Sequence, residues 1–178
     1  MAKPTIRKMN FKTIKHLLQL TATNLTIFTI ALIATMSFAV MPAWSADYNK
    51  QTLTESDFSH QDLTDASFDH TNLRGSDFSF SNLSGVRLFG ANLSATNFEG
   101  ADLRNASLES TRMTRANLTN AVLEGAYLTN VMLQGATITG ADFTGALLSP
   151  TTERKLCEIA TGTNTTTGRN TKDTLFCP

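Results

Sequence analysis

The side chains best suited to chemistry are few in this 178-residue sequence, which contains three histidines and two cysteines. Glu55, His60, Asp65 and His70 place ionisable groups at four successive positions with a spacing of five residues. Imidazole and carboxylate groups together can hold a metal ion or move a proton. Such a site requires its groups to lie close together, and the backbone decides whether a spacing of five allows that.

Other arrangements that support catalysis are missing from the sequence. It contains no Ser/His/Asp arrangement, no CxxC pair and no glycine-rich phosphate loop. We therefore predict that the protein is not an enzyme, with no catalytic residue, no metal and no cofactor.

The first 45 residues differ in charge from the rest of the chain. They hold five of the 15 basic residues and none of the 15 acidic ones, so the remainder carries a formal net charge of −5. A basic start, an uncharged apolar run over 25–41 and small residues before position 46 are typical of a secretory signal peptide. We predict residues 1–45 as this peptide, with cleavage after Ser45 or after Ala46. The protein would then meet the membrane only through this segment before cleavage. The alternative is an uncleaved anchor, for which 17 apolar residues are at the short limit.

From residue 51 to residue 150 the sequence repeats every five residues. The central residue of each repeat, here called position i, is Leu, Phe, Met or Ile at all 20 occurrences from Leu53 to Leu148. Position i−2 is Ala ten times, and position i−1 is Asn or Asp ten times. Position i+1 is Ser or Thr twelve times, and all eight glycines of this region lie at i+2. A period of five fits neither the helical period of 3.6 nor the strand period of 2.

These columns predict a coil with short, flat sides. In an extended segment, residues i and i−2 point to the same side, so one large and one small side chain can fill a narrow interior. Asn or Asp at i−1 can hydrogen-bond nearby backbone, and Gly at i+2 permits a sharp bend. A chain that bends every five residues closes after about four bends, and its backbone then pairs with neighbouring coils. His60 and His70 would occupy opposite corners, too far apart to share a metal ion, and we interpret them as part of a solvated rim.

The motif itself resembles a known family. Residues 91–93, 101–103 and 116–118 have the sequences Ala-Asn-Leu, Ala-Asp-Leu and Ala-Asn-Leu. They match the A(D/N)LXX motif of the pentapeptide-repeat family, and the resemblance extends over 100 consecutive residues without an insertion. It implies an all-β solenoid, a right-handed quadrilateral β-helix of five coils over 51–150. Residues 46–50 would be an N-terminal linker or cap, in which Tyr48 could cover the first coil.

Residues 20 apart should stack in the interior of such a coil. We predict two core columns in particular, each contributing one side chain per coil. The first is Phe58, Phe78, Phe98, Leu118 and Ile138, and the second is Leu63, Leu83, Leu103, Leu123 and Phe143.

The period of five stops after residue 150. Ser149-Pro150 is typical of a helix start, and we predict a short helix over 151–160 that ends before Gly162. Leu156, Ile159 and Ala160 would form its apolar side, and one further turn is expected over 171–176.

Both cysteines, Cys157 and Cys177, lie in this tail. Because disulfides persist in exported proteins, we expect the two to be joined, the alternative being two buried free thiols. Residues 151–178 also resemble the end of exported pentapeptide-repeat proteins of cyanobacteria. That resemblance implies a disulfide-bracketed helical cap and a location in the thylakoid lumen or the periplasm.

Recognition is left to the outward positions. Phe89, Tyr127 and Leu147 fall on one face by the 20-residue count. We expect this face to contact a partner protein, a second subunit or the C-terminal tail, although isolated apolar residues are common on surfaces. Phe80, Val122 and Met132 also occupy outward positions, and Arg104 and Glu124 should form a surface ion pair.

The sequence therefore favours an exported scaffold or protein-interaction module that is not an enzyme. The partner is an unidentified protein or a second copy, and no nucleic acid is expected. The alternative is a DNA-mimicking topoisomerase (gyrase) inhibitor, a role known in the pentapeptide-repeat family. The signal segment argues against it, as does the modest acidity of residues 51–150, which hold 11 acidic residues against 5 arginines.

Overall fold

The structure is a computed structural model that describes residues 46–178. The predicted signal peptide, residues 1–45, lies outside the described residues. Residues 46–178 belong to one compact unit. Within residues 46–178, no helix combines the length and the apolar character needed to cross a bilayer.

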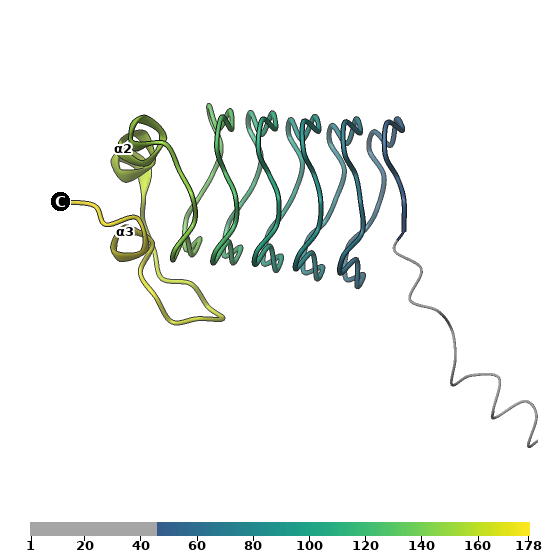
Figure 1. Cartoon of the computed structure of the whole chain (residues 1–178). Coiled ribbons are helices and arrows are strands. Elements are labelled where there is room, and N and C mark those ends of the chain that lie inside the picture. The colour runs from purple at the N-terminus through teal and green to yellow at the C-terminus, as the bar shows by residue number, and fades with distance from the viewer. Residues whose placement is uncertain (1–45) are drawn as a thin grey trace, which may run out of the picture. The chain divides into compact units, whose positions relative to one another are not determined.

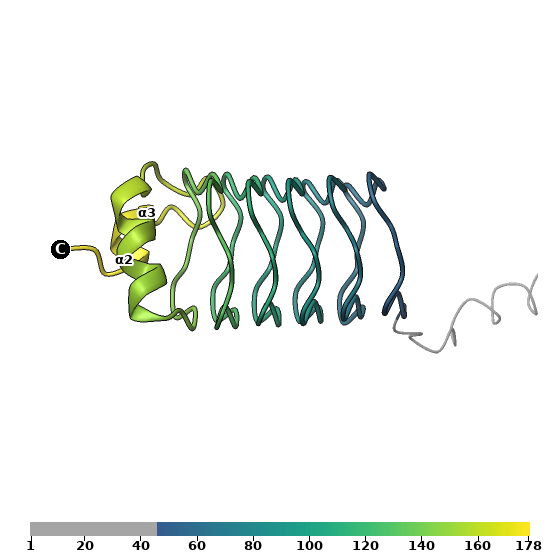
Figure 2. The ribbon, with the colours of Figure 1, turned by 90° about the horizontal axis from the view of Figure 1, so that it is seen from above.

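Residues 46–149 wind into a coil that advances by one layer every 20 residues (Figures 1 and 2). Parallel bridges join each residue at i−1 to the residue 20 positions later, from Asp47–Ser67 to Tyr127–Leu147. Leu83 N–H donates to Asp102 O over 2.7 Å, and Asp102 N–H donates to Ser81 O over 2.9 Å. The bridges are isolated pairs because each side is interrupted by a turn after only a few extended residues.

The coil begins five residues earlier than predicted. Residues 46–50 are a repeat of the array rather than a linker, since Asp47 bridges Ser67 and Lys50 N–H donates to Asp69 O over 2.9 Å. Tyr48 occupies position i of this repeat, and its ring stacks on Phe68 with the centroids 4.6 Å apart. The repeat cannot be recognised from a pattern that requires Leu, Phe, Met or Ile at position i, because its i residue is a tyrosine.

The core is the set of inward side chains at i and i−2. All ten residues of the two predicted core columns are buried, and the rings of Phe58, Phe78 and Phe98 stack in succession. At five of the positions where i−2 is Ser or Thr instead of Ala, the residue is buried and its hydroxyl donates to a backbone carbonyl. Ser76 Oγ, for example, donates to Leu53 O over 2.6 Å, and Thr96 Oγ1 donates to Leu73 O over 2.9 Å. These bonds offset the cost of removing the hydroxyls from water.

The Asn and Asp residues at i−1 satisfy a backbone group that the coil leaves unpaired. Asp57 Oδ1 accepts from Ser59 N–H over 2.9 Å, and Asn117 Oδ1 accepts from Thr119 N–H over 3.1 Å. The same contact, from i−1 to the N–H of i+1, recurs along the array because that N–H points away from the adjacent coils.

At many i+2 corners, glycine is required because there is no space for a Cβ, and not only because the backbone has a positive φ. Every corner has a positive φ, and residues as large as His70 and Phe80 adopt it. A Cβ on Gly100 would lie 2.7 Å from the ring of Phe80, one coil earlier, and a Cβ on Gly90 would lie 2.7 Å from His70 Nδ1. At five of the eight glycine corners, a Cβ would thus lie no more than 2.8 Å from the side chain at the corner of the preceding coil.

Helix α2 (Pro150–Ile159) follows the last repeat and lies across the end of the coil (Figure 2). It starts one residue before the predicted range, because Ser149 is its N-cap and accepts from Thr152 N–H over 3.1 Å. Leu156 and Ala160 join the hydrophobic core, as predicted. Ile159, predicted on the same side, is exposed and borders a hollow between α2 and the repeat that contains Val131 and Leu133.

A short helix, α3 (Thr171–Thr174), lies beside α2 at the same end (Figure 1). Asn170 is its N-cap and accepts from Lys172 N–H over 3.0 Å. A disulfide joins Cys157 in α2 to Cys177 after α3, with the two Cα atoms 5.5 Å apart. The two helices are thus tied together over the last coil.

The corner geometry predicts that two glycines with the same backbone conformation will respond differently to alanine. A Cβ added to Gly140 (φ +69°) would clash with Asn120 Oδ1 and lie 3.2 Å from Thr163 O. A Cβ added to Gly145 (φ +66°) would meet no atom within 4 Å. Both substitutions should cost about 1–2 kcal/mol because of the left-handed conformation. Gly140→Ala should cost roughly 1–3 kcal/mol more because of overpacking. Urea denaturation measures both, and equal losses would show that φ alone selects glycine.

Candidate interaction surfaces

The four sides of the coil present four outward faces, each built from repeats 20 residues apart. Each face is defined by its inward i residues. Three are named after their outward side chains, and the Phe-stack face is named after its inward rings. The apolar face is centred on Tyr48, Phe68, Leu88, Leu108, Leu128 and Leu148. The arginine face is centred on Leu53, Leu73, Leu93, Met113 and Leu133. The Phe-stack face and the acidic face are centred on the first and second predicted core columns, respectively.

The apolar face carries the three residues predicted to contact a partner. Phe89, Tyr127 and Leu147 are 44%, 45% and 52% exposed. Tyr127 and Leu147 are bridged neighbours on successive coils, and Phe89 lies edge-on to the ring of His70 at 5.4 Å. Their exposure shows that the C-terminal tail, one of the three predicted occupants, does not cover this face.

The ionisable corners of the first coil do not form a cluster. His60 stacks on the ring of Phe80 at 5.3 Å, and His70 contacts Phe89. Within residues 46–178, no three histidine, cysteine or acidic side chains come together as a group that could hold a metal ion.

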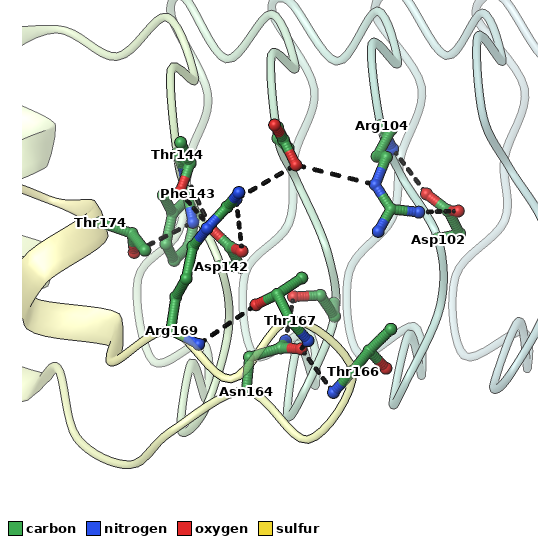
Figure 3. Close-up of polar contacts among 12 residues, drawn as sticks. Asp102, Arg104, Asp142, Phe143, Thr144, Asn164, Thr166, Thr167, Arg169 and Thr174 are labelled. Carbon is green, nitrogen blue, oxygen red and sulfur yellow. Dashed lines mark hydrogen bonds and ion pairs between the residues drawn. The ribbon is translucent and has the colours of Figure 1, made fainter.

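A loop that the sequence did not place on the coil folds back along the acidic face. Asn164 is buried, and its Nδ2 donates to the carbonyls of Gly140 (2.8 Å), Asn120 (3.1 Å) and Ala121 (3.3 Å). Its Oδ1 accepts from the N–H groups of Thr166 and Thr167, both over 2.9 Å (Figure 3). One amide side chain thus satisfies backbone groups of both the coil and the loop.

The same loop supplies an arginine to a row of carboxylates. Arg169 Nη1 lies 3.1 Å from Glu124 Oε2 and 3.2 Å from Asp142 Oδ2 (Figure 3). The predicted Arg104–Glu124 pair is long, at 3.8 Å, because Arg104 turns to Asp102 in its own repeat. Val122, predicted outward, is buried, and the loop contacts the backbone of Ala121 and the side chain of Glu124 on either side of it.

Asp142 is the most enclosed carboxylate of this row, with its side chain fully buried. Burial raises the pKa of Asp142, but hydrogen bonds from Thr144 and Thr167 and the charge of Arg169 outweigh burial. The pKa therefore lies below its usual value, and the carboxylate is ionised at neutral pH. Its role is to hold the loop, because its oxygens face protein groups rather than a free cavity.

Shallow hollows surround the C-terminal helices. One, of about 480 Å³, lies beside the disulfide between Arg154, Lys172 and the exposed Phe176. Another, of about 370 Å³, separates α2 from the last repeat of the arginine face at Val131 and Leu133. Neither contains a set of groups typical of a cofactor or metal site.

Comparison with known proteins places this coil among pentapeptide repeats. The family described as Pentapeptide repeats matches in eight copies over residues 52–88, 81–120 and 111–149. No curated protein matches the chain.

Solved structures show the same likeness. A pentapeptide repeat protein from the thylakoid lumen of Arabidopsis thaliana is 38% identical with a TM-score of 0.51, over 73% of this chain and 90% of that one. A pentapeptide repeat protein from Nostoc PCC 7120 is 25% identical with a TM-score of 0.51, over 67% and 95% of the two chains. A plasmid-mediated fluoroquinolone resistance protein is 20% identical with a TM-score of 0.30, over 60% and 68% of the two chains. That last likeness supports no argument about function.

The lowered pKa of Asp142 predicts a specific loss of stability in acid. A depressed folded-state pKa gives stability that is fully present above the unfolded value and is lost as the pH falls through the folded value. Asp142→Asn should lower the free energy of unfolding at pH 7 by about 1–3 kcal/mol, since it removes charged hydrogen bonds. It should also flatten the decline of stability below about pH 4.

A matched control uses an exposed carboxylate with a similar local bond. The pKa of Asp57 is lowered by its hydrogen bonds to Ser59, but this side chain has no arginine partner. Asp57→Asn should change the acid profile less than Asp142→Asn in urea denaturation between pH 2.5 and pH 7. Indistinguishable profiles for the two variants would contradict the role given to Asp142.

Proposed function

This chain belongs to the pentapeptide-repeat family, and on that premise we propose that it is an exported scaffold, not an enzyme, that binds another protein through its apolar face. Family membership implies the right-handed quadrilateral β-helix. The proposal adds that the repeats over residues 46–149 make five complete coils and the start of a sixth, closed at one end by a helical cap.

Export to the thylakoid lumen or the periplasm is part of the proposal. The charge and apolar run of residues 1–45 support it, as does the lumenal relative that is 38% identical. The disulfide between Cys157 and Cys177 is also consistent with an oxidising compartment. Cleavage after Ser45 would remove the predicted signal segment and leave the repeat at 46–50 intact.

The exposure of the apolar face is the observation that carries the binding role. A coil has three outward positions per repeat, and in this array they are mostly Asn, Asp, Ser, Thr and Gly. On the apolar face, Phe89, Tyr127 and Leu147 break that pattern and stay accessible. Aromatic and large aliphatic side chains on a rigid backbone are typical anchors of a protein interface, because little conformational entropy is lost on binding.

Inhibition of a topoisomerase by DNA mimicry has no observation in its favour. The relative with a resistance role is too distant to carry an argument. The loop arginine, Arg169, also neutralises part of the acidic face.

Removal of the two aromatic anchors tests the proposal. We expect Phe89→Ser/Tyr127→Ser to lose a protein that tagged wild type retains in affinity purification from its native membranes. The control, Phe80→Ser/Phe176→Ser, removes two aromatics that are at least as exposed but lie elsewhere. Its retained proteins should match those of wild type. The binding role is wrong if the two double variants retain the same proteins as wild type.

A further inference from the structure

Charge is unevenly distributed around the coil. Arg74, Arg112 and Arg115 lie on the arginine face with one acidic residue, Glu55. The acidic face has one arginine within its repeats, Arg104. Its acidic residues are Asp62, Asp65, Asp102, Glu124 and Asp142. Because the four faces follow one another around the coil, the arginine face and the acidic face lie on opposite sides.

Within residues 46–178, no carboxylate forms an ion pair with the cations of the arginine face. Arg87 and Arg104, the other arginines of the repeats, form ion pairs with Asp69 and Asp102. Among the described residues, Arg74, Arg112 and Arg115 form no ion pair. Unpaired guanidinium groups held on a rigid sheet are suited to binding carboxylates, which they meet with parallel hydrogen bonds.

The arginine face also borders a surface hollow. Arg112 is bridged to Met132 on the next coil, and the two border a hollow of about 350 Å³ at the corner with Gly90 and Ser110. Met132 is among the exposed large apolar residues. The arginine face thus combines cations with an apolar edge. Such a combination is typical of a surface that contacts another protein.

The acidic face offers carboxylates that are already oriented. Asp62 is exposed on the first coil, and its Oδ1 accepts from the N–H and the hydroxyl of Thr64. These bonds hold one oxygen and leave the other available. Asp102 is held in the same way by Arg104 N–H over 3.1 Å, although its second oxygen is shared with the Arg104 side chain.

The spacing along the two faces agrees. Asp62 and Asp102 are 40 residues apart, which is two coils. Arg74 and Arg115 are 41 residues apart, in repeats that are also two coils apart. Both faces have the same rise of about 4.8 Å per coil. If two parallel copies are offset by one coil along the coil axis, Arg74 and Arg115 of one copy can therefore lie against Asp62 and Asp102 of the other.

We propose that copies of this protein associate side by side, the arginine face of one against the acidic face of the next. The contact is heterologous, because each copy uses two different faces, so it can extend to rows rather than close as a dimer. It is independent of the apolar face and of the function proposed above.

The size of the contact makes it weak. After a shift by one coil, four coils of each face overlap, a contact about 19 Å long and roughly 16 Å wide, or about 300 Å² per copy. That is less than half of the roughly 800 Å² per partner of a standard interface. Each copy carries a net charge of −5 over residues 46–178. The alignment of opposite charges must therefore overcome a general repulsion, and the association should be sensitive to salt.

Sedimentation velocity of residues 46–178, the compact unit, tests the proposal. At low ionic strength the average mass should rise with protein concentration up to about 0.5 mM, and 0.5 M NaCl should return it to that of a single chain. Arg74→Glu/Arg115→Glu, without a working arginine face, should stay a single chain in both conditions. Asp62→Lys/Asp102→Lys, without a working acidic face, should do the same.

An equimolar mixture of these two variants gives the sharpest result. Each keeps the face that the other lacks, and the two reversed faces are also opposite to each other in charge, so the mixture should form a complex in which the two variants alternate. Arg154→Glu/Lys155→Glu and Glu153→Lys/Glu158→Lys make the same changes of net charge on α2, and both should associate like wild type.

A wild type that stays a single chain at low salt overturns the proposal, as does a mixture that never forms the complex. If wild type stays a single chain but binds vesicles of anionic phosphatidylglycerol through Arg74 and Arg115, the arginine face serves a membrane surface and self-association is wrong.

Discussion

Every feature of this protein depends on one coupled constraint: the backbone must pair with itself 20 residues later while a single large side chain per five residues enters the interior. The hydrogen bonds between coils satisfy the amides of i−1, i and i+2, and turn bonds satisfy i−2. The remaining amide, at i+1, takes a side-chain acceptor from i−1 where that residue is Asn or Asp. Each position of the five-residue motif thus has a defined hydrogen-bond partner for its backbone N–H. Two of the five positions are committed to the core, and three are left for the surface.

Much of this could be predicted from the sequence because the constraint repeats. The two core columns, from Phe58 to Ile138 and from Leu63 to Phe143, are buried as expected. Their burial requires only the period of five and the alternation of an extended chain. Periodicity fails where a residue type departs from the column. Because Tyr48 stands at position i, the pattern predicts a linker or cap over 46–50 instead of a repeat, although Tyr48 does stack on Phe68 of the first coil. The reason for the corner glycines was also incomplete, because the space below Phe80 or His70 depends on a residue 20 positions away.

The C-terminal loop could not be predicted for a different reason. Asn164 and Arg169 lie in a stretch rich in Thr and Asn that has no period, so their partners depend on the path of the loop. One buried amide and one arginine fix that path, through carbonyls of Asn120 and Gly140 and carboxylates of Glu124 and Asp142. This contact alters the surface as well. It neutralises one end of the acidic face through Arg169, while Phe89, Tyr127 and Leu147 on the neighbouring apolar face stay exposed.

The inward direction of position i is the central claim, and two leucines test it most directly. Leu103 lies at i and is buried, whereas Leu147 lies at i−1 and is half exposed. Thermal unfolding of Leu103→Asp should show a severe loss of stability, because an unpaired carboxylate enters a dry column. Leu147→Asp should melt close to wild type. A Leu103→Asp variant that melts like wild type, or two variants that lose stability equally, would contradict the arrangement of the whole coil.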